Sequence, residues 1–332
     1  MTISYLDSHR ISGLSSDTKP TNVETNSIYI STDDQKRTWF NGSDWVSQIV
    51  RGIFGGGHTG ADSNVMDYIT ISTTGNATDF GDLTVARKRL AGCSSETRGV
   101  FGSGSNTNIM DYITIATTGN ATDFGDLTLS TVGSAALSSS TRGIFGGGDG
   151  ADTTVIDYIT IATTGNAVDF GNLSVGRYNL AGLSSSTRGV FGGGNGGSGY
   201  VNTMDYITIA TLGNATDFGD LTLARGWVAG VSSDTRGVFG GGYTGAFTNV
   251  MDYITISTLG NATDFGDLTV ARWSAGGVSS DTRGVFAGGF SSGFAIRDVM
   301  DYITISTLGN ATDFGDLTVA RSYLAGLSDY SP

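Results

Sequence analysis

The stretch Arg-Gly-Ile-Phe-Gly-Gly-Gly at residues 51–57 indicates the fold, because its first four residues return along the chain. Arg-Gly-Ile/Val-Phe starts at residues 51, 98, 142, 188, 236 and 283, so the copies lie 44 to 48 residues apart. Each copy is followed by Asp-Tyr-Ile-Thr-Ile and then, with small changes, by Gly-Asn-Ala-Thr-Asp-Phe-Gly-Asp-Leu. A period of about 40–50 residues that is rich in β-forming residues is typical of a β-propeller.

The composition also favours an all-β chain. Of 332 residues, 52 are Gly and 2 are Pro, and the usual helix formers Glu and Lys are scarce beside Thr, Ile, Val and Tyr. The net charge of −13 disfavours nucleic acid as a partner, because an acidic surface repels phosphates. One Cys excludes an intrachain disulfide, and no apolar run reaches the roughly 20 residues of a membrane span. The first ten residues lack the apolar core of a secretory signal, so we expect no export by that route.

Each repeat divides into four short strands, which we call a, b, c and d. In the second repeat they correspond to residues 90–94, 98–102, 109–116 and 123–127. No strand a precedes residue 51, but residues 323–328 supply one after the sixth strand d. We therefore predict a six-bladed propeller over residues 51–332, closed by its C-terminal strand, with a separate module at residues 1–50.

The repeat resembles the kelch type of propeller repeat over residues 51–328. Phe-Gly-Gly-Gly stands at the kelch double glycine, a hydrophobic strand c follows, and Leu-Thr-x-Ala-Arg precedes the next strand a. Phe80 and Phe124 stand where kelch repeats usually have Trp, and the c–d connection is longer. The resemblance implies four-stranded blades, and it implies little about function, because propellers have many functions.

The repeats differ at two places that topology puts on one face. In an antiparallel blade the b–c and d–a connections emerge on the same side, and these are the connections that vary in length and content. We call this side the variable face; the a–b and c–d connections form the repeated face. Aromatic residues gather in the variable connections of repeats four to six, which favours ligand binding there over neutral drift of the loops. The predicted ligand-binding residues are Trp227, Trp273, Tyr243, Phe247, Phe290 and Phe294.

Catalytic chemistry is poorly represented, and we predict that the chain is not an enzyme. Only His9 and His58 are histidines, and His58 lies in a Gly-rich loop without an evident triad partner. No cofactor is expected. The recurrent Asn76, Asp79 and Asp82 could bind calcium through their oxygens, but we favour a role in capping local turns.

The first fifty residues lie outside the repeats. Residues 28–30 and 38–40 flank an acidic turn at 33–36, which predicts a β-hairpin, and Asn41-Gly42 predicts a second turn toward Trp45. Residues 15–24 are interpreted as a linker. The segment 20–45 resembles a short hairpin module of bacteriophage tail-fibre and other virion appendage proteins.

That resemblance implies a virion protein, assembled in the host cytoplasm and then extracellular. Residues 1–50 would join other virion proteins or sister copies of the chain, which includes assembly as a homo-oligomer. The propeller would bind a host surface glycan or protein, without nucleic acid and without insertion into a membrane. The rival hypothesis is a structural decoration or assembly subunit of the virion with no host ligand, and a glycan-degrading enzyme ranks third.

Overall fold

The computed structural model describes residues 50–149 and 154–330 in full, together with Lys19 and the backbone of five strands before residue 50. The chain separates into two compact units, Met1–Val50 and Arg51–Pro332. In the described residues, no helix is long and apolar enough to cross a membrane.

The first unit contains one sheet with the strand order β1-β2-β3-β4-β5. Its strands are β1 Ser4–Asp7, β2 Arg10–Gly13, β3 Ile28–Ser31, β4 Arg37–Phe40 and β5 Trp45–Ser47. The predicted hairpin is confirmed, because β3 and β4 are antiparallel and Ile28 lies opposite Trp39. Strands β1 and β2 were not expected, and β2 lies parallel to β3. The turn at 33–36 and, except for Lys19, the linker at 15–24 lie outside the described residues.

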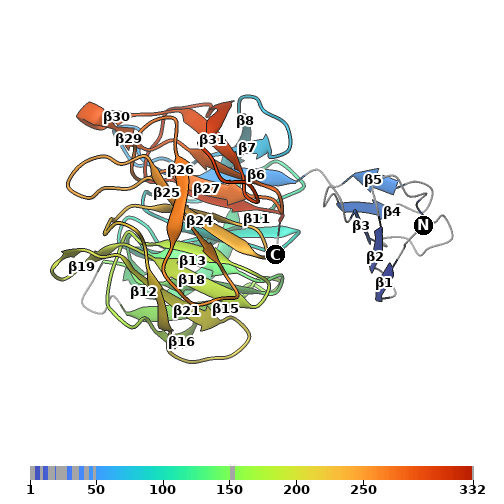
Figure 1. Ribbon diagram of the computed structural model, residues 1–332, viewed down its shortest axis with the longest axis horizontal. Helices are drawn as coiled ribbons and strands as arrows, with labels where there is room; N and C mark the ends of the chain where they lie inside the picture. The colour runs from blue at the N-terminus through green and yellow to red at the C-terminus, as the bar shows by residue number, and fades with distance from the viewer. Residues whose placement is uncertain are drawn as a thin grey trace. The chain divides into compact units, whose positions relative to one another are not determined.

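The second unit is a β-propeller of six blades, each a sheet of four antiparallel strands (Figure 1). The fold class predicted from the repeats is thereby confirmed. From strand a to strand d, the first three blades are β33 Ala325–Ser328, β6 Arg51–Gly55, β7 Val65–Thr70 and β8 Thr78–Asp82; β9 Ala91–Ser94, β10 Arg98–Gly102, β11 Thr107–Thr114 and β12 Thr122–Thr131; β13 Ala135–Ser138, β14 Arg142–Gly146, β15 Val155–Thr160 and β16 Val168–Asn172.

The fourth and sixth blades carry extra short elements in their b–c connections, and the fifth blade has none. The main strands of the last three blades are β17 Ala181–Ser184, β18 Arg188–Gly192, β21 Thr203–Thr208 and β22 Thr216–Asp220; β23 Ala229–Ser232, β24 Arg236–Gly240, β25 Val250–Thr255 and β26 Thr263–Asp267; β27 Gly276–Ser279, β28 Arg283–Ala287, β31 Val299–Thr304 and β32 Thr312–Asp316. The extra elements are the ribbon of β19 Asn195–Gly196 and β20 Gly199–Tyr200, the ribbon of β29 Phe290–Ser291 and β30 Ala295–Ile296, and the single turn η1 Ser292–Phe294.

The C-terminal strand closes the propeller as predicted. Strand β33 pairs antiparallel with β6, with Ala325 opposite Gly55 and Leu327 opposite Ile53. Leu324 and Leu327 are buried. The first blade is therefore built from both ends of the repeat region, and the ring has no unpaired edge at the junction.

The core lies between the faces of neighbouring blades. Phe101 is fully buried, and its ring lies 2.8 Å from the point where a Cβ on Gly55 of the preceding blade would be. The glycine that ends strand β6 therefore makes room for the Phe of the next repeat. Near the axis, a Cβ on Gly230 would lie 2.6 Å from the carbonyl oxygen of Gly182, so the innermost strands also need small residues. Cys93 is buried there, as predicted, and burial raises the pKa of its thiol.

The arginine that opens each strand b connects its blade to the next one. Its guanidinium lies over the ring of the Tyr in strand c of its own blade, at 4.2 to 4.7 Å, as Arg51 does over Tyr68. The same group donates a hydrogen bond to an Ile carbonyl of the next blade, as Arg51 does to Ile115, and this contact recurs at all six junctions. The recurrence of this arginine in the sequence therefore has a structural cause.

The recurrent asparagine of the c–d connection also acts between blades. The side-chain oxygen of Asn120 accepts a hydrogen bond from the backbone N–H of Asp82, at the end of strand β8 in the preceding blade. Equivalent bonds of 3.0 to 3.1 Å occur at the other five junctions. Our expectation that these side chains cap local turns was wrong for the asparagines, because their partner belongs to the neighbouring blade. No cluster of three or more potential metal ligands occurs in the part of the chain that the structure describes.

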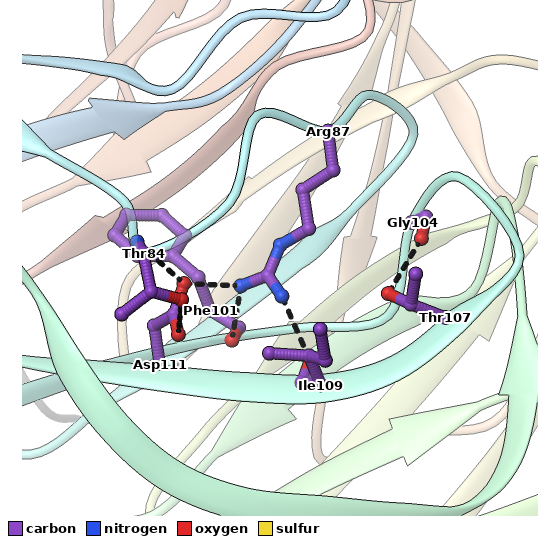
Figure 2. A network of polar contacts seen from close by, with 7 residues as sticks. All are labelled: Thr84, Arg87, Phe101, Gly104, Thr107, Ile109 and Asp111. Atoms are coloured by element: carbon purple, nitrogen blue, oxygen red, sulfur yellow. Dashed lines mark hydrogen bonds and ion pairs between the residues drawn. The ribbon is translucent and has the colours of Figure 1, made fainter.

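A buried ion pair crosses five of the six junctions. Figure 2 shows the first pair, in which Arg87 contacts Asp111 at 2.8 Å and also donates to the carbonyl oxygens of Phe101 and Ile109. Thr84 donates its hydroxyl to the same carboxylate. The other four pairs are Arg177–Asp205, Arg225–Asp252, Arg272–Asp301 and Arg321–Asp67, and every side chain in the five pairs is fully buried.

The junction between the second and third blades lacks this pair. Thr131 stands where the other repeats have the arginine, and Asp157 keeps only the hydrogen bonds from the backbone and hydroxyl of Thr128. Asp157 is nevertheless 4% exposed. Desolvation consequently raises the pKa of Asp157 above its ordinary value.

Candidate binding site on the variable face

The two variable sets of residues lie together, as the topology predicts. The residue after the d-strand arginine forms a backbone bridge to the b–c connection of its neighbour, as in Trp273 with Phe290 and Gly226 with Tyr243. Tyr178 pairs in the same way with Asn195. The variable face is therefore a continuous backbone structure in blades four to six rather than a set of separate loops.

A closed ring of backbone hydrogen bonds surrounds the propeller axis on this face. Six residues, each the second after the d-strand arginine or its equivalent, have φ between +55° and +74°. Each donates its N–H to the carbonyl oxygen of the preceding member at 2.6 to 3.0 Å, and the first member donates to the last. We call these residues the axial ring; they are Arg89, Gly133, Asn179, Trp227, Ser274 and Tyr323.

The axial ring imposes one backbone conformation on residues of unlike chemistry. A positive φ costs a non-glycine residue roughly 1–2 kcal/mol, and five of the six members are not glycine. The hydrogen bond that each member makes to the next compensates for this strain. The side chains are therefore held around the axis while their identity remains free.

A small cavity lies inside the axial ring, and we call it the axial pocket. It is open to solvent, has a volume of about 70 Å³ and is lined by all six ring residues. Leu90, Leu180, Val228, Ala275 and Leu324 supply its apolar part, and Ser134 also lines it. The pocket thus combines an apolar wall with the polar groups of the ring.

The predicted ligand-binding residues form one aromatic cluster beside the pocket. The rings of Trp227 and Trp273 are 4.4 Å apart between centroids, and Trp273 also contacts Tyr243 and Phe290. Phe294 reaches the cluster through Phe247, Phe290 and Trp273. All six predicted residues are brought together, although they come from three different repeats.

Two aromatic residues were missing from the predicted set. Tyr200 contacts Trp227 and Tyr243, and Tyr323 contacts Trp273 and Phe290. Both lie in the variable connections, so their position in the sequence was a usable signal. The cluster extends from the fourth blade to the start of the first through these two rings.

Burial divides the cluster into supporting and exposed residues. Trp273 and Phe290 are 8% and 9% exposed, so they support the cluster rather than present a free surface. Phe294 is 63% exposed, and Trp227, Tyr243 and Phe247 are half-buried. Truncation of Trp273 or Phe290 should therefore lower stability, because both are packed as core residues are.

Charged groups are few at the axis. The guanidinium of Arg89 lies over the Tyr323 ring at 4.6 Å and donates to the Tyr323 hydroxyl at 3.2 Å. Lys88 pairs with Asp62 at 3.0 Å, farther along the face. Desolvation acts to raise the pKa of Asp62, but the hydrogen bonds from Ser105 and Lys88 and the charge of Lys88 outweigh it and lower that pKa. The Lys88 charge is thus neutralised locally, whereas Arg89 has no acidic partner among the described residues.

No model of a known protein family matches the chain, and no curated protein matches it either.

Proposed function

We propose that the chain is a virion appendage protein that binds a receptor on the host surface through the variable face. The observation that carries the binding hypothesis is the aromatic cluster, in which half-buried and exposed rings are held by buried ones. Flat aromatic side chains contribute contact area and lose little rotamer entropy when they bind, and they stack well on sugar rings.

The repeated face gives a second reason to assign the binding site to the variable face. Its recurrent arginines and asparagines are used in contacts between blades, as Arg51 is with Ile115 and Asn120 is with Asp82. Their recurrence therefore needs no ligand to explain it.

The virion assignment is supported by the resemblance of residues 20–45 to tail-fibre hairpin modules.

A binding assay with variants on both faces tests the proposal. The full chain, fluorescently labelled, would be applied to a glycan array and to bacterial cells that carry different surface polysaccharides. We expect Phe294→Ala and Trp227→Ala to weaken binding tenfold or more with an unchanged melting temperature. Leu259→Ala is the matched control, because Leu259 is a 52% exposed apolar residue in a c–d connection on the repeated face.

The outcomes separate the two leading hypotheses. Loss of binding in Leu259→Ala but not in the aromatic variants would place the receptor site on the repeated face and contradict the proposal. If the parent chain binds none of the cells or glycans, the hypothesis of a structural subunit is favoured.

The structural alternative has one specific observation in its favour. Blades four to six expose Leu212, Leu259 and Leu308, at 52 to 54%, where the first three blades have Thr. Exposed apolar side chains at equivalent positions suit contact with another protein.

Deleting residues 1–46 tests the attachment role of the first unit, since we expect a folded propeller that no longer joins the particle.

A further inference from the structure

A larger pocket lies on the repeated face, where the c–d connection of the first blade meets the sixth blade, and we call it the junction pocket. It is open to solvent and has a volume of about 330 Å³. Its lining comes from the end of β7, from residues 73–78 and from Phe314 in β32 of the sixth blade. Ligand pockets start at roughly 300 Å³, so this one suits a ligand about the size of a single sugar ring.

Backbone contacts between the two blades hold the junction pocket in shape. The N–H of Gly75 donates to the carbonyl oxygen of Phe314 at 2.7 Å. The N–H of Ala77 donates to the carbonyl oxygen of Asp316 at 2.8 Å, and the N–H of Asp316 donates to Oδ1 of Asn76 at 3.1 Å. The c–d connection is therefore fixed at three points before any ligand arrives, so little ordering of the chain would oppose binding.

The lining offers neutral hydrogen-bonding groups that the fold does not use. Thr73, Thr74 and Thr78 line the pocket and are exposed, and their hydroxyls make no hydrogen bond with the described residues. Each hydroxyl can donate as well as accept. None of the described residues that line the pocket is charged. The complementary ligand is therefore uncharged and carries several hydroxyl groups.

Tyr68 adds an aromatic side chain to the same lining. It is half-buried, and its ring contacts the guanidinium of Arg51 at 4.7 Å and the ring of Phe80 at 6.1 Å, both measured to the ring centroid. An aromatic ring held in this way loses little rotamer entropy when it contacts the C–H groups of a sugar. Aromatic and hydroxyl groups together match a sugar, which presents both C–H and O–H groups.

The threonine at position 73 recurs although the fold does not use its side chain. Every repeat has Thr there, and all six are exposed and make no side-chain hydrogen bond with the described residues. The preceding position is also exposed in every repeat, and it alternates between Ser and Ala. Exposed residues of this connection have therefore diverged, and retention of the threonine favours a role outside the fold.

We propose that the junction pocket binds one neutral sugar residue of a glycan, with the sugar ring against Tyr68 and its hydroxyls bonded to the exposed threonines. This inference goes beyond the proposed function, because the pocket lies on the repeated face and the receptor site on the variable face. The ligand class follows from the lining, which is uncharged, hydroxyl-rich and partly aromatic.

The sequence limits which blades carry the complete set of lining residues. The second blade has the same residue type at every lining position, with Thr118 for Thr74 and Thr122 for Thr78. The third blade has Val168 in place of Thr78, and the last three blades have Leu in place of Thr74. We therefore expect sugar binding at the first two blades and not at the other four.

The test measures binding of uncharged monosaccharides to the full chain by saturation-transfer difference NMR, which detects weak ligands. The probes are D-glucose, D-galactose, D-mannose and N-acetyl-D-glucosamine, and we expect at least one to bind saturably. Binding by none of them would overturn the inference. Tighter binding of D-glucuronate or D-glucosamine than of every uncharged sugar would overturn the neutral ligand, and equally tight binding of glycerol would overturn the role of the sugar ring.

Substitutions that equivalent blades already contain locate the site. The double variant Thr74→Leu with Thr118→Leu introduces the residue of the last three blades, and Thr78→Val with Thr122→Val introduces that of the third blade. Each pair removes hydroxyls from both complete sets and should weaken sugar binding roughly fivefold or more, with an unchanged melting temperature. Thr164→Leu in the third blade is the matched control and should bind normally. Normal binding by both folded double variants would overturn the inference.

The variants also separate this inference from the proposed function. If Trp227→Ala abolishes sugar binding and the threonine variants do not, the sugar lies on the variable face, so the junction pocket is wrong and the proposed function stands. If the threonine variants lose the sugar while Phe294→Ala and Trp227→Ala leave cell binding unchanged, the junction pocket stands and the proposed receptor site is wrong.

Discussion

Arg87 at the end of the first blade lies 2.8 Å from Asp111 in the second blade, and both side chains are fully buried. The pair spans the junction between two sheets that share no hydrogen-bonded strand. Blade-to-blade cohesion therefore includes a charged contact as well as apolar packing, and the Thr131 repeat shows what remains when the arginine is absent.

Replacing Arg87 with Met should destabilise the propeller strongly. The variant leaves Asp111 buried without a counter-charge, which typically costs about 3–5 kcal/mol. Urea unfolding followed by circular dichroism measures the loss. The double variant Arg87→Met with Asp111→Asn is the control and should recover much of it, and equal stability of Arg87→Met and the parent protein would contradict the prediction.

Replacing Asp157 with Asn should stabilise the propeller at neutral pH. The pKa of Asp157 is raised in the folded state, so the folded protein binds the proton more tightly than the unfolded chain does. Stability therefore falls as the pH rises from the pKa of the unfolded state to that of the folded state. The Asn variant removes this loss, and its advantage should disappear toward pH 3. Asp205→Asn is the matched control and should be destabilising, because it leaves Arg177 buried without its partner. Chemical unfolding between pH 3 and 8 gives both results, and a destabilised Asp157→Asn at pH 7 would argue against the account.

Asp329 should contribute a second loss of stability with rising pH. Desolvation raises its pKa to about 7, against the opposing effect of the hydrogen bond from the Arg51 N–H at 2.7 Å. The sign is the same as for Asp157, so stability should decrease between about pH 4 and 7. Asp329→Asn can still accept the Arg51 hydrogen bond and should flatten this part of the pH profile; an unaltered profile would show that the group is not responsible.

Truncation after Arg321 should open the propeller. The deletion removes β33, exposes the edge of β6 and loses the burial of Leu324 and Leu327, which contributes about 1.5–3 kcal/mol each. We expect a lower melting temperature and more light scattering on heating. Deletion of residues 331–332 alone keeps β33 and is the control. A truncated chain that melts like the parent would exclude closure as a source of stability.

The architecture could be predicted from the sequence because each blade repeats the same strand pattern. The recurrence from Arg51 gave the blades, and residues 323–328 gave the closure, since a leftover strand a matches a first blade that lacks one. The roles of Arg51 and Asn120 could not be predicted. Their partners are backbone groups of Ile115 and Asp82. Because every residue type carries these backbone groups, the sequence does not show which of them is the partner.

The candidate site was only partly predictable for a similar reason. Aromatic residues in variable connections pointed to Trp227 and Phe294, but burial distinguishes the supporting Trp273 from them only in three dimensions. The axial ring was not foreseen, because its six members share a position and a backbone conformation rather than a residue type. Gly133 and Asn179 alone are residues that commonly adopt a positive φ.

The axial ring has a consequence for how recognition by such a protein can change over generations. Its six hydrogen bonds join main-chain atoms only, so a change of side chain at any one member can leave all six bonds and the contacts between blades in place. Arg, Gly, Asn, Trp, Ser and Tyr already occupy equivalent places within this single chain. Under the proposed function, we expect mutations there to arise one at a time, each altering ligand binding at the variable face while the protein stays folded. A scaffold of this kind could follow a changing target by single amino-acid steps.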